Sequence, residues 1–322
     1  MRAVTVVEGR LEWREHPDPE VGAGELLVDV RAAGLNSSDM LQRRGLYPAP
    51  RGVSPDIPGL ELAGEVVDVG RGVERFGVGD RVMAVLAGGA QAERAVVHER
   101  VALPVPGALT WEQAGGFPEV FTTAHDALFT QCELGPGERA LIHGAAGGVG
   151  IAAVQVAALA GARVTATVRN PDLRDDVAAI GARAGSVQVV APDSFAEHGP
   201  FDVVLELIGA PNLAANLGAL ATWGRIAVIG VGAGASAEIN LLALMAARGR
   251  IHGSTLRPRP LEEKASAARL VEAHVLPFVG DDPGSARIQV PVAATYPMSD
   301  AKAAYDRFVA GGKLGKIVLV RE

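Results

Sequence analysis

The sequence is poor in cysteine and has no long hydrophobic run. Cys132 is the only cysteine among 322 residues, so an internal disulfide and a zinc site built from several cysteines are both excluded. The Ala-rich stretch from Ile151 to Ala160 is too short to cross a bilayer. The first residues lead into a strand-like segment without a signal-peptide pattern, so we expect a cytoplasmic protein.

Basic residues are not in excess either. The chain has 30 Lys and Arg against 37 Asp and Glu, which gives a formal net charge of -7. Such a surface repels phosphate backbones and anionic lipid, so we expect no nucleic-acid or membrane partner. The hydrophobic fraction of 48% is ordinary for a globular protein, and the length favours two domains.

The first third of the chain has the pattern of a compact, partly antiparallel β domain. Short runs of Val, Leu and Ala alternate with turns rich in Gly and Pro. The strands predicted there cover residues 3–7, 25–32, 64–69, 80–86 and 92–97.

The pattern changes after residue 108. Thr110 and Gln113 form a capping-box signature for a helix over residues 109–113, and residues 121–129 also have a helical pattern. From residue 139 onward strands and helices alternate, which predicts a parallel sheet covered by helices. The predicted strands are 139–143, 163–168, 187–190, 201–207 and 225–230, and the predicted helices are 149–160, 172–180 and 212–221.

The last part of the chain has a helical stretch after residue 261 and then a β-rich segment over 287–322. We therefore expect an α/β protein in which a doubly wound, Rossmann-type parallel sheet is inserted into a mainly β domain made from both chain ends. The predicted domains are residues 1–122 with 262–322, and residues 123–261.

A glycine-rich loop is the most specific motif. The segment Leu141-Ile142-His143-Gly144-Ala145-Ala146-Gly147-Gly148-Val149-Gly150 follows a predicted strand and opens a predicted helix. Small residues let the backbone approach a pyrophosphate closely, and the helix N-terminus offers unpaired N–H groups. The motif predicts a dinucleotide site, with a tight turn that binds nothing as the alternative.

The tip of the second predicted strand indicates which dinucleotide binds. NAD sites usually place an acidic residue there, whereas residues 165–170 contain none. Arg169 follows Gly150 by nineteen residues, where the 2′-phosphate of NADP would lie, and Arg174 is about one helical turn further on. The pattern favours NADPH, unless both arginines are solvated beside three nearby aspartates.

Several motifs occur here together, and they identify a family resemblance. Besides the glycine loop, these motifs are Ala32-Ala33-Gly34-Leu35-Asn36-Ser37-Ser38-Asp39, Arg43-Arg44-Gly45-Leu46-Tyr47, Ile57-Pro58-Gly59-Leu60-Glu61-Leu62-Ala63-Gly64-Glu65-Val66 and Gly312-Lys313-Leu314-Gly315-Lys316-Ile317-Val318-Leu319. With them the chain resembles the zeta-crystallin-like, zinc-free NADPH:quinone oxidoreductases, a branch of the medium-chain dehydrogenases/reductases, and looks closest to the tumour-suppressor-inducible quinone reductase subgroup. The resemblance covers essentially the whole chain and implies that the β domain is GroES-like and catalytic.

The resemblance argues against a metal. Metal-dependent alcohol dehydrogenases of this superfamily carry a Cys where this chain has Asn36, and a His where it has Leu60. Neither residue can replace those zinc ligands. Without zinc to stabilise an alkoxide, an acceptor that delocalises its own negative charge is favoured, such as a quinone or a conjugated enone.

The resemblance also implies site residues. Asn36 would lie near the nicotinamide and the acceptor oxygen, Tyr47 would line the acceptor pocket, and Thr123 would lie near the nicotinamide ribose or amide. As alternatives, Asn36 could be a turn residue, Tyr47 a packing residue and Thr123 a helix-start hydroxyl. The implied cofactor-binding residues are Ala146, Gly147, Gly148, Val149, Arg169, Asn170, Arg174, Ile208, Gly230, Val231, Ser254 and Lys316.

The chain departs from the family that it resembles at the cofactor phosphate. Relatives often have Gly-Ser, a Lys and a Tyr where this chain has Arg169-Asn170, Leu173 and Gln188. A preference for NADPH therefore depends on Arg169 and Arg174.

We predict an NADPH-dependent, zinc-independent oxidoreductase that transfers hydride to a quinone. One alternative is an NADPH-dependent enone or alkenal double-bond reductase, and another is a non-catalytic NADPH-binding protein. Family resemblance also implies a homodimer that joins the cofactor-domain sheets edge to edge. The loop over residues 44–55 is expected to shape acceptor specificity.

Overall fold

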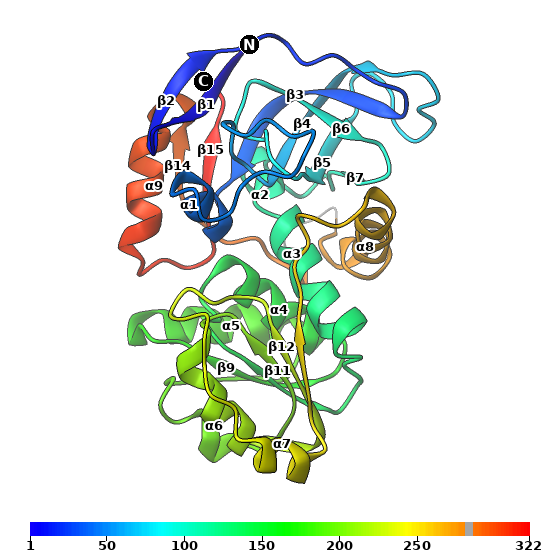
Figure 1. Ribbon diagram of the computed structural model, residues 1–322. Coiled ribbons are helices and arrows are strands. Elements are labelled where there is room, and N and C mark those ends of the chain that lie inside the picture. The colour runs from blue at the N-terminus through cyan, green and yellow to red at the C-terminus, as the bar shows by residue number, and fades with distance from the viewer. Residues whose placement is uncertain (281–285) are drawn as a thin grey trace. The chain divides into compact units, whose positions relative to one another are not determined.

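The chain folds into two compact units in a computed structural model that describes residues 1–280 and 286–322 (Figure 1). The first unit comprises Met1–Thr122, Leu256–Ala286 and Val290–Glu322. The second comprises Thr123–Thr255 and Arg287–Gln289. Among the described residues, no helix combines the length and the apolar character needed to cross a membrane.

The first unit is built on a seven-stranded sheet to which both ends of the chain contribute. Its order is β14-β15-β3-β4-β5-β7, and β6 pairs with β3. The C-terminal strand β15 runs antiparallel to β3, with Val318 opposite Gly34. The strands of this unit are β1 (Arg2–Val7), β2 (Arg10–Glu15), β3 (Glu25–Gly34), β4 (Glu61–Val69), β5 (Arg81–Val85), β6 (Arg94–His98), β7 (Ala102–Pro104), β14 (Val292–Pro297) and β15 (Lys316–Val320).

Alternation of side chains along the strands produces the core of this unit. In β3, Leu26, Val28 and Val30 are buried while the residues between them are partly exposed, as expected for a strand with one face on the core. Tyr305 is buried in the same core. The helices are α1 (Ser37–Arg43), α2 (Trp111–Gly115), α8 (Leu261–His274) and α9 (Ala301–Ala310), and α3 (Pro118–His125) crosses into the second unit.

The second unit is a six-stranded parallel sheet flanked by helices (Figure 1). Its order is β10-β9-β8-β11-β12-β13, so the direction of winding reverses between β8 and β11. This arrangement confirms the doubly wound α/β prediction, and ligands of such sheets bind at the carboxyl ends of the strands near the reversal. The elements are β8 (Arg139–Ile142), α4 (Gly148–Leu159), β9 (Arg163–Thr167), α5 (Arg174–Ala184), β10 (Val187–Val190), β11 (Phe201–Glu206), α6 (Leu213–Gly218), β12 (Leu220–Val228), α7 (Leu241–Ala247) and β13 (Arg250–Gly253).

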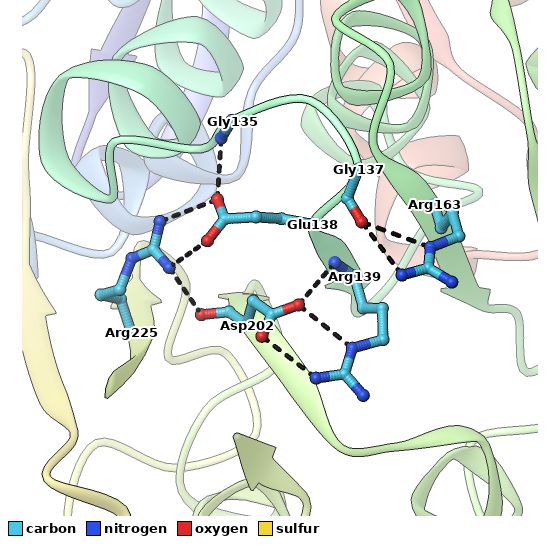
Figure 2. Close-up of polar contacts among 7 residues, drawn as sticks. All are labelled: Gly135, Gly137, Glu138, Arg139, Arg163, Asp202 and Arg225. Atoms are coloured by element: carbon cyan, nitrogen blue, oxygen red, sulfur yellow. Dashed lines mark hydrogen bonds and ion pairs between the residues drawn. The ribbon is translucent and has the colours of Figure 1, made fainter. Parts of the chain in front are cut away.

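A polar network joins strands of this sheet close to the amino ends of β8 and β11 (Figure 2). The Arg139 guanidinium donates two hydrogen bonds of 3.1 Å to the Asp202 carboxylate. The Arg225 guanidinium donates to both oxygens of Glu138, at 2.7 and 3.0 Å, and these hydrogen bonds hold the pKa of Glu138 below its usual range. Two bidentate pairs therefore connect β8 with β11 and β12 at the edge opposite the expected cofactor site.

Two predicted helices differ from the observed ones. The helix over 121–129 is instead α3 followed by a π-helix, Asp126–Gln131, and such π-turns cannot be distinguished from an α-helix by periodicity. The predicted helix 212–221 ends at Gly218, because Leu220 already begins β12. The predicted Thr110 cap is confirmed, since its hydroxyl accepts from the Gln113 N–H at 3.3 Å.

Candidate functional site

The glycine loop has the close packing that a dinucleotide site requires. Gly144 follows β8 with a φ of 62°, a conformation that favours glycine. A Cβ added to Gly150 would lie 2.3 Å from the Gly144 carbonyl oxygen, so α4 passes too close to the loop for a larger residue. Gly147 is the N-cap of α4, and the N–H groups of the first turn are available to an anion. The backbone thus fits a pyrophosphate at the segment 146–149.

The other predicted cofactor residues follow the carboxyl ends of neighbouring strands. Arg169 and Asn170 follow β9, Ile208 follows β11, and Ser254 follows β13. These strands are parallel members of one sheet, so their ends lie along the same edge. Gly230 and Val231 follow β12, and the Gly230 N–H donates to the Glu206 carbonyl at 3.1 Å.

The two arginines at the tip of β9 have different environments. Arg169 is exposed, and its side chain makes no ion pair or hydrogen bond within the described part of the chain. Arg174 folds back onto the strand end, where its Nε donates to the Val168 carbonyl at 3.1 Å. The Asn170 side chain caps the following turn by accepting from the Asp172 N–H at 3.1 Å. Arg169 is therefore the more available cation for a ligand phosphate.

Glu206, which sequence reasoning missed, organises the loop beside the glycine turn. Its Oε1 accepts from the Ile208 N–H at 2.6 Å and the Gly209 N–H at 2.8 Å. Its Oε2 accepts from Asn216, which also contacts His143 at 2.8 Å. His143 is buried, and burial lowers its pKa. The sequence does carry a signal for Glu206, because it is an acidic residue at the end of a predicted buried strand.

Thr123 and Ser254 belong to the same unit and lie near a π-helix. Thr123 is the sixth residue of α3, so it is not a helix-start hydroxyl. Ser254 Oγ lies 3.4 Å from Oδ2 of Asp126, the first residue of the π-helix. π-Helical turns are frequent at functional sites, and this one follows Thr123 by three residues.

In the first unit, Asn36 and Lys316 meet in a buried cluster. The Lys316 ammonium lies 2.6 Å from Glu61 Oε1, 2.8 Å from Asn36 Oδ1 and 2.7 Å from the Leu35 carbonyl oxygen. The Asn36 amide nitrogen donates to Glu61 at 2.9 Å and to the Gly34 carbonyl at 3.3 Å. Both side chains therefore use their polar atoms within the cluster, and Lys316 has no spare N–H for a distant phosphate.

Two further acids surround this cluster and were not predicted as a group. Asp39 accepts from the Asn36 N–H at 2.8 Å, and Glu119 donates its own N–H to Glu61 at 2.9 Å. Burial, reinforced by the Glu61 charge, raises the pKa of Glu119 to about 8. Burial likewise raises the pKa of Asp39 to about 7. The cluster holds more carboxyl groups than cations, so it retains protons near neutral pH.

These side chains do not fit a zinc ion. Asn36 and Leu60 offer no ligand, and a lysine ammonium pairs with Glu61. Across residues 1–280 and 286–322, no group of three or more His, Cys, Asp or Glu side chains is arranged to hold a metal. A fixed cation, Lys316, is the positive charge present beside Asn36.

Tyr47 lies in the same unit, beside Arg257. The Arg257 guanidinium is 5.0 Å from the centre of the Tyr47 ring. Burial raises the pKa of the Tyr47 hydroxyl, so it remains a neutral phenol that can donate a hydrogen bond.

Two known families match the sequence, one mainly in each of the two units. The sequence matches the family described as alcohol dehydrogenase GroES-like domain over residues 22–130. It matches the family described as zinc-binding dehydrogenase over residues 148–273.

Similar proteins cover the chain to different extents. The quinone oxidoreductase of Rattus norvegicus is 30% identical over 316 residues, which is 94% of this chain and 91% of the relative. The polyketide synthase GfsB of Streptomyces halstedii is 41% identical over 208 residues, which is 64% of this chain but 4% of the synthase. The chain therefore corresponds to a small part of such synthases.

Solved structures similar to this chain include two proteins that were determined in complex with NADPH. The quinone oxidoreductase of Thermus thermophilus, also solved with NADPH, has a TM-score of 0.82 and 33% identity, and the match covers 99% of this chain and all of that one. A mycobacterial protein solved in complex with NADPH has a TM-score of 0.84 and 30% identity, again over 99% of this chain and all of that one.

Proposed function

Because the chain belongs to the medium-chain dehydrogenase/reductase family, an oxidoreductase family that uses a nicotinamide cofactor, we propose that it reduces a quinone with NADPH and without a metal ion. The observation that carries this proposal is the buried Lys316–Glu61 ion pair with Asn36 attached to it. It puts an ammonium beside the residue that stands where metal-dependent relatives have a cysteine. When bound, NADPH supplies the hydride.

The second unit would bind the cofactor. The first turn of α4, with Ala146, Gly147, Gly148 and Val149, would hold the pyrophosphate. Arg169 and Arg174 would hold the 2′-phosphate. Charge-assisted hydrogen bonds of this kind are worth about 1.5–3 kcal/mol each, roughly a tenfold to hundredfold preference. Asn170, Ile208, Gly230, Val231 and Ser254 would border the cofactor along the same sheet edge.

The first unit would bind the acceptor. Since both amide hydrogens of Asn36 are engaged by Glu61 and Gly34, Asn36 would act through the cluster and Lys316 would orient it. The Tyr47 hydroxyl is then the neutral donor that we assign to the acceptor, whereas the Thr123 hydroxyl in the second unit would lie near the nicotinamide ribose or amide. A quinone spreads the incoming negative charge over its ring and takes its proton from water, so a strongly tuned acid is not required.

The test is oxidation of NADPH and NADH with a simple benzoquinone in the presence of a chelator. We expect turnover that the chelator does not change and that is faster with NADPH. Loss of activity with the chelator would refute the metal-free mechanism. Cofactor binding without turnover of any acceptor would favour a non-catalytic role.

A second candidate is reduction of an enone or alkenal double bond. A conjugated enone delocalises the charge left by hydride transfer as a quinone does, and 64% of the chain is also similar to a polyketide synthase. Both reactions need the same hydride geometry. Parallel assays with a benzoquinone and a linear enone separate them, and faster turnover of the enone would replace the quinone proposal.

We also propose a cytoplasmic homodimer. The parallel sheet ends at β13, and an unpaired edge strand can pair with a second copy. The neighbouring helix α7 consists of Leu, Ala and Met, yet none of its residues is buried. A second copy along this edge would cover both features.

A further inference from the structure

A buried arginine lies behind the ring of Tyr47. The Arg257 side chain belongs to a residue that is 3% exposed, and its guanidinium carbon is 5.0 Å from the centroid of the Tyr47 ring. Its Nη1 donates a hydrogen bond of 2.9 Å to the Tyr47 carbonyl. Arg257 therefore contacts both the main chain and the ring of the same residue.

The same guanidinium connects Tyr47 to two other segments. Its Nη2 donates to Oε1 of Gln42 at 2.7 Å, and its Nε donates to the Ala87 carbonyl at 2.6 Å. The Gln42 amide in turn donates to the Pro55 carbonyl at 3.2 Å. The loop over residues 44–55 is thus fastened near both ends, at Tyr47 and at Pro55, by one hydrogen-bonded pair.

Among the described residues, the charge of Arg257 has no ion-pair partner. Its hydrogen-bond acceptors are two carbonyls and one amide, and in residues 1–280 and 286–322 no carboxylate is close enough to form a salt bridge with it. Burial lowers the pKa of Arg257, while Tyr47, Asp39 and Glu119 act on that pKa in the opposite direction. A guanidinium remains charged even so, so an uncompensated positive charge is buried directly behind Tyr47.

We propose that Arg257 is a positioning residue that fixes Tyr47 and makes this side of the site selective for planar, ring-shaped acceptors over linear ones. This inference rests on the proposed function, in which Tyr47 faces the acceptor. A cation on one face of an aromatic ring is attracted by its π-electrons and fixes its plane. The opposite face of Tyr47 can then stack on a planar acceptor, and the charge strengthens its hydroxyl as a donor.

The charge assists the reduction at the acceptor oxygen. Hydride transfer oxidises the cofactor, delivers two electrons to the quinone and leaves negative charge on its oxygens. One proton from solvent then completes the hydroquinone. A fixed positive charge in a buried site stabilises the transition state in which that negative charge develops.

The first test measures the pair without an acceptor. Tyrosinate absorbance is titrated in the wild type, R257M and R257K, with Y47F subtracted to isolate Tyr47. Arg257 lowers the pKa of Tyr47 against the effect of burial, so R257M should raise that pKa and R257K should preserve it. R81M is the matched control, because Arg81 lies over the Trp111 ring at 4.3 Å in the same unit. No shift in R257M would overturn the inference.

The second test is a double-mutant cycle on quinone reduction. R257M should lower kcat/KM for a benzoquinone about tenfold, with KM for NADPH unchanged. In the Y47F background the same substitution should have little effect, whereas losses that simply multiply would show that Arg257 does not act through Tyr47. If R257M fails to fold, R257K decides: it keeps the charge but loses the planar guanidinium that orients the Tyr47 ring. It should therefore lose more activity toward a benzoquinone than toward a linear enone, and equal losses would refute the selectivity. A wild type without quinone turnover would refute the proposed function. The titration would still test whether Arg257 acts on Tyr47.

Discussion

Lys316 Nζ lies 2.6 Å from Glu61 Oε1, and both side chains are almost completely buried. Removing one partner of such a pair leaves an uncompensated charge in the interior. We expect Lys316→Met to lower the free energy of unfolding by about 3–5 kcal/mol, measured by urea denaturation.

Lys302→Met is the matched control. Lys302 also pairs with a carboxylate at 2.6 Å, but both side chains are more than half exposed. Exposed pairs contribute less than about 1 kcal/mol. Similar losses in the two variants would show that the Lys316 pair is not buried.

Glu119 should make stability fall as pH rises. Its pKa in the folded protein is about 8, against an ordinary value of 4.5. Between these values the folded state binds more protons than the unfolded state, so each such group lowers the free energy of unfolding by up to about 1.4 kcal/mol per pH unit. The contribution is complete below pH 4.5 and lost as the pH passes 8.

Glu119→Gln should flatten this dependence, measured by denaturation at pH 5, 7 and 9. Asp39, whose pKa is raised to about 7, leaves a smaller slope in the variant. Glu263→Gln on the exposed face of α8 is the control and should leave the wild-type slope intact. An unchanged slope in the Glu119 variant would contradict the assignment.

Arg169 should set the cofactor preference. Because Arg169 is exposed and Arg174 is tied to the Val168 carbonyl, loss of Arg169 should remove the more available phosphate contact. We expect Arg169→Ala to raise KM for NADPH about tenfold or more and to leave KM for NADH unchanged. Arg163→Ala removes the same charge at the opposite sheet edge, where Arg163 donates to the Gly137 carbonyl (Figure 2), and should change neither value.

The fold was largely predictable because its signals are local. The all-apolar strands, the alternation after residue 139 and the glycine loop each determine a parallel sheet element without help from distant residues. The helix α9 lay unrecognised within the predicted β-rich segment 287–322. Its ten residues include four alanines and few large apolar side chains, so the sequence shows only a weak helical pattern of apolar residues there.

The site was predictable only where one motif contains the whole feature. Glycine spacing predicts the loop at 144–150, but nothing local to Glu61 or Lys316 indicates that these residues, 255 positions apart, form an ion pair. Arg257 contacts Tyr47 from 210 residues away and belongs to no motif we recognised. Such clusters depend on how the two chain ends assemble into one sheet, and a single sequence does not report that pairing.

The exposed apolar helix α7 should be a dimer contact. Leu242 is 76% exposed and lies in a helix without a buried residue, next in sequence to the edge strand β13. A charge there would be placed in the apolar centre of the proposed interface, where it costs several kcal/mol unless it is paired. We therefore expect Leu242→Asp to convert a dimer to a monomer in sedimentation velocity, with the parallel-sheet unit still folded. Val78→Asp, at a 67% exposed apolar residue of the other unit, should remain dimeric. A wild type that sediments as a monomer, or a Leu242 variant that stays dimeric, would move the interface away from this edge.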